Sequence, residues 1–400
     1  MEKNNPKSRF GMFAKKWSES RACDIFVIES DKGYSDLPIL SASQELGMVK
    51  RDNIGINMHY SKHNIASYKR VKPGRFVIHL RSFQGGFAHS SIDGITSPAY
   101  TVLSLKKPDI HDDYFWKYLF TSPEFIKRLE LVTYGIRDGR SISVEDFLDL
   151  SFCYPTTREE QHRIASFFTH LDYLIFSEEK KLTKLKNFKD ASLNKMFPRS
   201  GETTPQIRFK GFKGEWEEHP LDYYLKVYVE KNTDESYTKE DIFSVSNEYG
   251  VINQIKYQGK SLAGASLKGY KVTHEGNVIY TKSPLKNQPY GIIKTNKECS
   301  GIVSALYAVY TTTESVLADF VHFYFSSDKR LNDYLKPIVN KGAKNTLLVS
   351  DQGALSGNVI FPSDLKEQQK LISFFSRLDA LITAQELKAK KTPFSEEVIP

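Results

Sequence analysis

One stretch of this sequence occurs twice: PTTREEQHRIASFFTHLDYLI at residues 155–175 and PSDLKEQQKLISFFSRLDALI at residues 362–382. The copies align without a gap at an offset of 207 residues, and ten of the 21 aligned positions are identical. Each copy begins with a proline, places Glu-Gln five residues later and continues with apolar residues at helical spacing. The repeat therefore predicts two long helices built on one plan.

The repeat extends upstream of both helices. PKSRFGMFAKKW at residues 6–17 and PQIRFKGFKGEW at residues 205–216 share a proline, an arginine, two phenylalanines and a tryptophan at equal spacing. GITSPAY at residues 94–100 is matched by GIVSALY at residues 301–307. A period of about 200 residues is too long for a solenoid and indicates two copies of a domain followed by a helix. Residues 18–93 and 217–300 share little, so the frame is repeated while the surface between its parts has diverged.

Each domain is expected to be mixed α and β, with strands first and helices late. Strands are predicted around residues 76–80 and 100–105 in the first copy and 277–280 and 307–310 in the second. Helical spacing covers 113–131 and 316–335, and Thr121-Ser122-Pro123 and Ser326-Ser327-Asp328 divide each into two pieces. The predicted boundaries are a first domain at 1–155, a first helix at 156–200, a second domain at 201–362, a second helix at 363–392 and a tail at 393–400.

The first long helix is predicted to begin at a capping box formed by Thr157 and Glu160. Its apolar residues follow a heptad in which positions 178, 189 and 192 are exceptions, and no proline interrupts it before Pro198. It can run for roughly 37 residues, or about 55 Å, and must pack against a partner helix or bridge two domains. The second helix weakens at Gln385 and must end near Pro393. The apolar positions expected to pack the two helices are Ile164, Phe168, Leu171, Ile175, Leu182, Leu185, Leu371, Phe375, Leu378 and Ile382.

Composition narrows the class of protein. The 400 residues are 40% hydrophobic and 26% charged, which excludes a disordered chain. No apolar run approaches the roughly 18 residues of a membrane span. The three cysteines lie far apart and suggest neither a disulfide framework nor a zinc site, so a cytoplasmic protein is expected. The net charge of +8 is compatible with nucleic-acid binding but weak evidence by itself.

The known signatures of catalysis are incomplete in this sequence. Gly259-Lys260-Ser261 resembles the end of a phosphate-binding loop but has Gln254 where that loop needs glycine. Asn287-Gln288-Pro289-Tyr290 resembles an amino-methyltransferase motif without the glycine-rich cofactor loop. Pro108-Asp109 lacks the carboxylate and lysine that would complete a nuclease site. We therefore expect no catalytic, cofactor-binding or metal-binding residue in this chain.

Binding loops are the remaining candidates. Residues 81–91 and 281–291 occupy equivalent places and combine flexible backbone with cations, aromatic rings and amides, the side chains that read base edges. Residues 134–141 and 340–346 are basic, contain glycine and suit phosphate contacts, although solvated surface loops often have such a composition. The candidate DNA-binding residues are Arg81, Ser82, Gln84, His89, Arg137, Arg140, Lys282, Lys286, Asn287, Lys341, Lys344 and Asn345.

These features together resemble the specificity (S) subunit of type I restriction–modification systems. The resemblance rests on the Pro-x-x-Arg-Phe-x-x-Phe opening with its tryptophan, and on the proline, Glu-Gln and Phe-Phe…Leu-Asp pattern that leads each long helix. All of these features occur twice, and the match extends from Pro6 to about Lys391.

The resemblance implies an α+β fold with two target recognition domains in pseudo-twofold tandem, each followed by a long helix, the helices packed as an antiparallel coiled coil. It implies that each domain reads one half of a bipartite, asymmetric site in double-stranded DNA. It also implies that two methyltransferase (modification) subunits and restriction/translocase subunits are partners, and that these bind S-adenosylmethionine and ATP. One departure is the shortened second helix. Two alternatives stay open at this point: a single-chain enzyme that recognises and modifies DNA, and a scaffold that binds only proteins.

Overall fold

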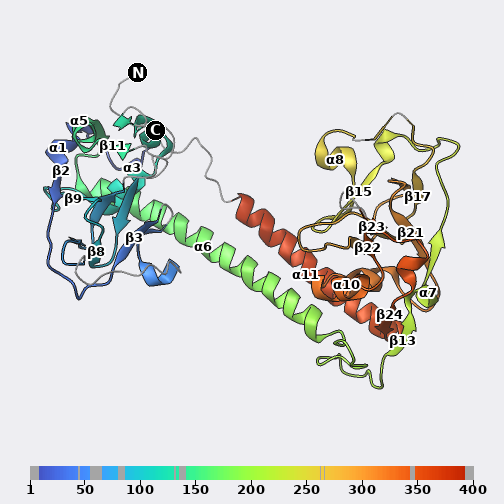
Figure 1. Cartoon of the computed structure of the whole chain (residues 1–400). Helices are drawn as coiled ribbons and strands as arrows, with labels where there is room; N and C mark the ends of the chain where they lie inside the picture. The colour runs from blue at the N-terminus through green and yellow to red at the C-terminus, as the bar shows by residue number, and fades with distance from the viewer. Residues whose placement is uncertain are drawn as a thin grey trace. The chain divides into compact units, whose positions relative to one another are not determined.

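The computed structural model describes residues 9–43, 46–54, 65–79, 86–129, 132–134, 141–261, 263–264, 266–342 and 347–391. Their contacts divide them into two compact units, one ending at Ser177 and the other running from Glu178 to Lys391 (Figure 1). Each unit contains one mixed α/β domain, which confirms the predicted duplication.

A four-stranded antiparallel sheet forms the centre of each domain, with equivalent strands in the same order. The predicted strands are its inner members, because their alternating apolar and β-branched side chains are buried on both faces. In the first domain the order is β2 (Phe26–Glu29), β9 (Thr101–Leu105), β6 (Arg75–Ile78) and β7 (Phe87–Ser90). In the second domain the order is β14 (Leu225–Tyr228), β21 (Ala308–Thr312), β18 (Val278–Thr281) and β19 (Ile292–Thr295).

Among the described residues, four short antiparallel pairs accompany each central sheet, and they too correspond between the domains. The first domain has β1 (Ser18–Arg21) with β12 (Ser151–Tyr154), β3 (Leu40–Ser43) with β4 (Gly47–Lys50), β5 (Lys69–Val71) with β8 (Gly94–Thr96), and β10 (Thr133–Tyr134) with β11 (Ser141–Ile142). The second has β13 (Glu217–Pro220) with β24 (Asn358–Phe361), β15 (Phe243–Ser246) with β16 (Gly250–Asn253), β17 (Lys271–Thr273) with β20 (Gly301–Val303), and β22 (Asn340–Lys341) with β23 (Leu347–Leu348). The diverged segments have therefore kept the topology.

The late helices of each domain are divided where the sequence predicts. In the first domain the Ser122 hydroxyl accepts from the Phe125 amide at 3.2 Å and so starts a new helix after the break. The helices that the structure describes in the first domain are α1 (Ala22–Ile25), η1 (Arg51–Ile54), α3 (Asp113–Phe120), α4 (Pro123–Leu129) and α5 (Val144–Asp149). Those of the second are α7 (Leu221–Tyr224), η4 (Lys239–Asp241), α8 (Gln254–Gln258), α9 (Ala318–Tyr324), α10 (Asp328–Leu335) and η6 (Gly353–Leu355).

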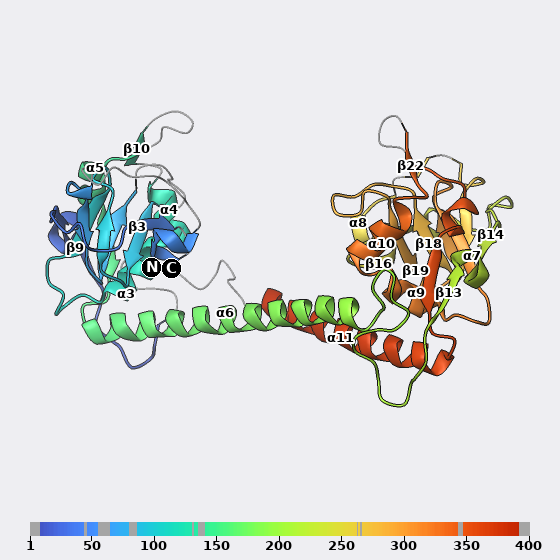
Figure 2. The same cartoon turned by 60° about the horizontal axis from the view of Figure 1, so that its bottom comes forward.

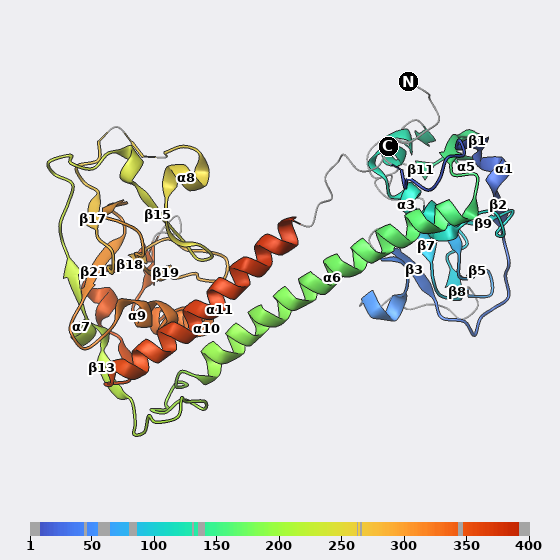
Figure 3. The ribbon, with the colours of Figure 1, turned by 180° about the vertical axis from the view of Figure 1, so that it is seen from behind.

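The first long helix has the predicted length, and the second ends close to the proline that was expected to stop it. Helix α6 (Arg158–Lys195) has 38 residues, begins in the first unit and ends in the second. Helix α11 (Leu365–Lys391) has 27 residues and ends two residues before Pro393. Within the second unit the last part of α6 lies beside α11 in antiparallel orientation (Figures 1 and 3). Among the described residues, no helix combines the length and the apolarity needed to cross a membrane.

Aromatic side chains fill the space between each central sheet and its late helices. In the first domain Trp116 of α3 is fully buried and contacts Phe26 with ring centres 5.1 Å apart. In the second domain Phe320 of α9, which corresponds to Phe115 of α3, is fully buried and contacts Phe197, which follows α6. The end of the first long helix therefore belongs to the core of the second domain.

Candidate nucleic-acid interface

The repeated opening segment is locked onto the start of each long helix by a buried ion pair. Arg9 donates to both carboxylate oxygens of Glu160, at 2.6 and 2.7 Å, and Arg208 binds Glu367 at 2.7 Å twice. The two glutamates are 1% and 2% exposed. The hydrogen bond to Glu160 raises the pKa of Arg9, so this guanidinium stays charged. The repeated arginine and glutamate thus form a structural clamp.

This clamp corrects the predicted capping box. The Thr157 hydroxyl does accept from the Glu160 amide, at 3.4 Å. The Glu160 carboxylate, however, binds Arg9 and accepts from the Trp17 indole N–H at 3.2 Å instead of returning to the Thr157 amide. Two charge-assisted hydrogen bonds to a guanidinium are stronger than one bond to a neutral backbone amide, so the distant arginine is the preferred partner.

The glutamine after each clamp glutamate joins the helix to its domain. Gln161 is fully buried; its carbonyl oxygen accepts from the Asp112 amide and its amide group donates to the Pro155 carbonyl, both at 2.8 Å. Asp112 in turn caps α3 through the Phe115 amide and contacts His162 Nδ1 at 3.0 Å. Gln368 makes the equivalent bonds in the second domain. The Glu-Gln pair therefore fixes the start of each long helix to its domain, and we call this pair the mount.

The second domain brings its two predicted DNA-binding loops together. Lys286 and Asn287 are exposed in the first loop, and the Asn287 carbonyl accepts from the Asn332 side chain at 2.9 Å. Lys341 is exposed in the second loop, and its ammonium lies 5.0 Å from the ring centre of Tyr290 in the first. The loops at 281–291 and 340–346 thus share one surface, although Lys344 and Asn345 lie outside the described residues.

Lys282 is engaged within the protein. Its ammonium donates to Asp351 at 2.7 Å and to the Val349 carbonyl at 2.8 Å, and Lys271 binds the second oxygen of Asp351. Burial by itself raises the pKa of Asp351, but the hydrogen bonds from the two lysines outweigh it and the net shift is downward. Two cations against one carboxylate leave a local charge of +1 beneath the loops. The sequence offered no signal that Lys282 would pair with Asp351, which lies 69 residues further along the chain.

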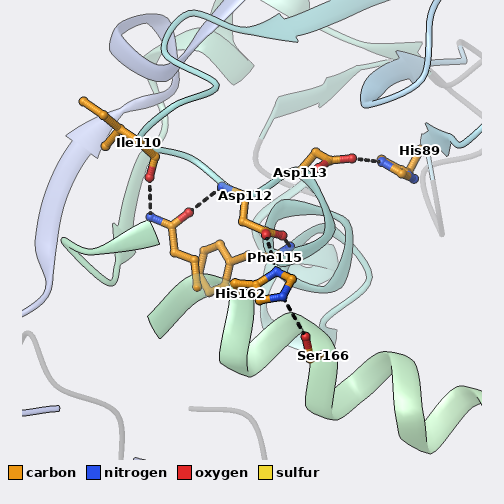
Figure 4. A network of polar contacts seen from close by, with 8 residues as sticks. His89, Ile110, Asp112, Asp113, Phe115, His162 and Ser166 are labelled. Atoms are coloured by element: carbon orange, nitrogen blue, oxygen red, sulfur yellow. Dashed lines mark hydrogen bonds and ion pairs between the residues drawn. The ribbon is translucent and has the colours of Figure 1, made fainter. Parts of the chain in front are cut away.

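His89 is the one candidate of the first domain within the described residues. It is 8% exposed, and its Nε2 lies 2.7 Å from Asp113 Oδ2 (Figure 4). Burial raises the pKa of Asp113, but the contact with His89 outweighs it and the net shift is downward. In this arrangement His89 joins β7 to α3 and presents little surface to a ligand. Arg81, Ser82, Gln84, Arg137 and Arg140 lie outside the described residues.

The hairpins β10–β11 and β22–β23 mark one end of each domain. Within its own unit, each hairpin lies at the end away from the long helix that packs against that domain (Figure 2). The exposed cation Lys341 belongs to β22, and the residues predicted to clamp phosphates in the first domain lie between β10 and β11. Exposed lysines and an amide at this end suit contacts to phosphates and base edges.

The predicted packing positions of the two long helices differ in burial. Leu371, Phe375, Leu378 and Ile382 of α11 are at most 9% exposed. The six positions of α6 are only partly buried, namely Ile164, Phe168, Leu171, Ile175, Leu182 and Leu185.

The polar exceptions to the two heptads meet each other. Gln385 donates to the Glu178 carboxylate at 2.6 Å, and Lys189 pairs with Asp379 at 2.5 Å. The heptad exception Ser192 is 7% exposed. Polar pairs of this kind restrict the register of a helix pair, because any shift leaves them without partners.

The comparisons with known proteins identify the fold. No family model matches this chain, and no curated protein matches its sequence. The crystal structure of a type I restriction–modification S subunit from M. genitalium matches with a TM-score of 0.57, 12% identity and coverage of 97% of this chain and 95% of that chain. A structure from work on complex assembly and conformational transition of the type I R-M system matches at 0.52, 13% identity and 95% of each chain. The chain therefore has the fold of type I S subunits, which confirms the sequence resemblance at the level of fold.

Proposed function

We propose that this chain is the sequence-specific DNA-binding subunit of a type I restriction–modification complex. Each domain reads one half of a bipartite, asymmetric site in double-stranded DNA. One observation carries the proposal: the two domains repeat the same sheet order and the same arginine–glutamate clamp around surfaces of different sequence. Two equivalent frames suit two copies of one partner subunit, whereas two domain surfaces of different sequence suit two different half-sites.

The long helices act as spacer and docking frame in this proposal. A helix of 38 residues is stiff and about 55 Å long, so its length sets how far apart two half-sites are read. The repeated Glu-Gln mount and clamp offer one equivalent surface per domain. Two methyltransferase subunits dock on these surfaces, and restriction/translocase subunits complete the complex.

DNA contact is proposed at the hairpin end of each domain. In the second domain Lys286 and Lys341 are exposed and meet phosphates, while Asn287 reads a base edge. In the first domain the equivalent contacts to DNA are made by Arg81, Ser82, Gln84, Arg137 and Arg140. Lys282 contributes charge from beneath the surface, since Asp351 already holds its ammonium.

The chain itself performs no chemistry in this proposal. Methyl transfer with S-adenosylmethionine and ATP-driven translocation and cleavage belong to the partner subunits, in the cytoplasm where the DNA lies. Within the described part of the chain, histidines, cysteines and carboxylates form no group of three or more that would hold a metal ion.

Two experiments test the proposal. Methylome sequencing of a host that carries this gene with its modification subunit should reveal one bipartite motif that disappears when this gene is deleted. Pure chain incubated with DNA and a radiolabelled methyl donor should transfer no label. A motif that persists after deletion, or methyl transfer by the pure chain, contradicts the proposed role.

A further inference from the structure

Four polar side chains form a continuous hydrogen-bonded chain on the surface of the second domain. Tyr228 ends β14 and Glu230 follows it closely, whereas His274 comes directly after β17 and Ser300 directly before β20. The Tyr228 hydroxyl donates to the Glu230 carboxylate and lies 3.0 Å from His274 Nε2. His274 Nδ1 lies 2.7 Å from the Ser300 hydroxyl. We call these four residues the relay.

The relay determines which ring nitrogen of His274 carries the proton. Because the Tyr228 proton is directed at Glu230, the Tyr228 oxygen can only accept from His274, which places the imidazole proton on Nε2. The hydrogen bond to Glu230 raises the pKa of Tyr228 to about 12, so Tyr228 keeps its proton at neutral pH. Nδ1 of the neutral ring is then a free base that accepts from Ser300. A serine that faces an oriented base is the arrangement that activates a hydroxyl as a nucleophile.

The first domain has different side chains at the same four places. Their positions in the equivalent strands match Tyr228, Glu230, His274 and Ser300 to Glu29, Asp31, Lys72 and Asp93, respectively. In the first domain Lys72 pairs with Asp31 at 3.7 Å, and Asp93 pairs with Arg70 at 2.7 Å. Ion pairs therefore suffice for the shared frame at this point, and the nucleophile and its base belong to the second domain alone.

The reactive end of the relay is open to solvent. Ser300 is exposed, and the side chain of His274 is 41% exposed. A small reagent can therefore reach the Ser300 oxygen without a change in the fold.

The charges near the relay favour an uncharged reagent. The Glu230 side chain is 52% exposed, and Glu275 and Glu298, next to the relay in sequence, are exposed as well. Lys297, the cation nearest to Ser300 along the chain, is paired with Asp319 at 3.2 Å. The carboxylates oppose the approach of an anionic donor such as an acyl phosphate. A neutral ester does not meet this repulsion.

We propose that Ser300 is a site of covalent acylation by neutral, activated esters. Ser300 Oγ forms a bond to the acyl carbon, the bond from that carbon to the leaving phenolate or alkoxide breaks, and the hydroxyl proton passes to His274 Nδ1. The imidazolium that results is stabilised by Glu230, which lies 3.8 Å from His274 Nε2. This single transfer makes Ser300 a modification site and requires no turnover. The inference lies outside the proposed DNA-binding role and does not depend on it.

The probe is p-nitrophenyl acetate, a small neutral ester whose leaving phenolate is followed by absorbance. After reaction with the full chain, neutral hydroxylamine removes acetyl groups from thiols, including the exposed Cys299, and leaves oxygen esters in place. Mass spectrometry of tryptic peptides should then find acetyl on Ser300, and the Ser300→Ala chain should lack it. Cys299→Ala, the matched control, removes the neighbouring nucleophile and should leave the rate of Ser300 acetylation unchanged.

Two further variants test the relay. His274→Gln should slow acetylation of Ser300 by about 100-fold, the lower end of the range for a general base. Tyr228→Phe should slow it by about twofold, because a ring without a fixed tautomer has Nδ1 free for only part of the time. Tyr228 is a positioning residue, so ¹⁵N NMR of His274 should show the proton on Nε2 in the unsubstituted chain and a mixture of tautomers in Tyr228→Phe. Urea midpoints show whether both variants are folded.

Three results would overturn the proposal. Acetyl on lysines or Cys299 with none on Ser300 would show that the hydroxyl is not activated. An equal rate of Ser300 acetylation in folded His274→Gln would show that His274 is not the base. Faster acetylation of Ser166, whose hydroxyl lies 3.4 Å from His162 Nε2, would place the reactive serine in the first unit (Figure 4).

Discussion

At the scale of single residues, the repeated motifs are parts of a mount rather than of a reactive site. Glu160 and Glu367 are buried carboxylates, and each is stabilised by an arginine more than 150 residues away along the chain. A buried ion pair contributes little net stability over an apolar pair, but loss of one partner leaves a charge without compensation. The clamp therefore acts mainly by specifying how the opening segment meets the helix.

Arg208→Ala should lower the free energy of unfolding by about 3 kcal/mol, because Glu367 is left buried and unpaired. Adding Glu367→Gln removes the buried charge and should restore part of this loss. Urea denaturation of both variants measures the coupling. The exposed Arg199→Ala is the matched control, with a change within about 0.5 kcal/mol. Equal losses in the single and double variants would contradict the clamp.

A second buried charge distinguishes the two domains. Lys294 of β19 is 6% exposed, and by the strand register it takes the place that Ala88 holds in β7 of the first domain. Burial and, to a smaller extent, Lys189 lower the pKa of Lys294 to about 8, while Asp379 and Asp328 oppose this shift. An ammonium at this position costs stability at neutral pH, because it loses most of its hydration.

Lys294→Met should stabilise the protein near pH 7 by an amount of the order of 3 kcal/mol. Below pH 8 both the folded and unfolded states carry the proton, and the folded state bears the cost. Between pH 8 and about 10.5 only the unfolded lysine keeps its proton, so the stability of the unsubstituted chain should rise with pH. Urea midpoints from pH 7 to 10.5 should therefore converge for the two proteins.

The exposed Lys210→Met serves as the control and should shift the midpoint little at any pH. A constant difference between the Lys294→Met and unsubstituted proteins across this pH range would contradict a depressed pKa at Lys294.

At the scale of elements, the irregular positions of the long helices are those that pair. Glu178 interrupts the heptad of α6 and Gln385 that of α11, and the two side chains bond to each other. The paired part of α6 begins at Glu178, and the residues before it belong to the first unit. A change in helix length placed before Glu178 therefore leaves the paired part intact.

Four residues inserted after Ser177 should lengthen the spacer of the recognised motif by one or two base pairs. The insertion adds about 6 Å of helix and turns the downstream part by about 40°. A heptad pattern tolerates an insertion of this length as a stutter, and about 6 Å spans nearly two base pairs. Methylome sequencing measures the spacer. The same four residues inserted after Gly211, in an exposed turn, should leave it unchanged.

If methylation continues with an unchanged spacer after the Ser177 insertion, the helix does not set the distance between half-sites.

At the scale of the whole molecule, the duplicated segments form a frame that both domains share, and the diverged segments between them differ from one domain to the other. Strand β1 pairs with β12 in the first domain and β13 with β24 in the second, so each domain is closed by its opening segment and the strand before its long helix. All residues between these strands form one insert on the frame. An exchange confined to the insert preserves the clamp and both long helices.

Replacing residues 22–150 by the matching segment of a relative should change one half of the methylated motif and leave the other half and the spacer unchanged. The reciprocal exchange of residues 221–357 should change only the other half. Methylome sequencing of hosts with each hybrid measures both outcomes. A hybrid that alters both halves at once would contradict one reader per domain.

Most of the plan of this protein can be predicted from its sequence. The offset of 207 residues, the breaks at Ser122 and Ser327 and the helix limits at Pro198 and Pro393 all follow from local rules or from alignment of one half with the other. These features can be recognised without knowledge of the fold, because helix periodicity, capping and proline geometry depend on a few neighbouring residues.

The partners of the charged groups cannot be predicted in this way, because they depend on which polar groups the folded protein satisfies internally and which it leaves for a ligand. The local sequence predicts that Glu160 caps its helix, but the Glu160 carboxylate binds Arg9. The sequence also predicts that Lys282 contacts DNA, but the Lys282 ammonium binds Asp351. Lys294 gave no local signal of its burial. A buried charged side chain binds the partner that best compensates for its lost hydration. That partner can come from any part of the chain, so its identity depends on the completed fold.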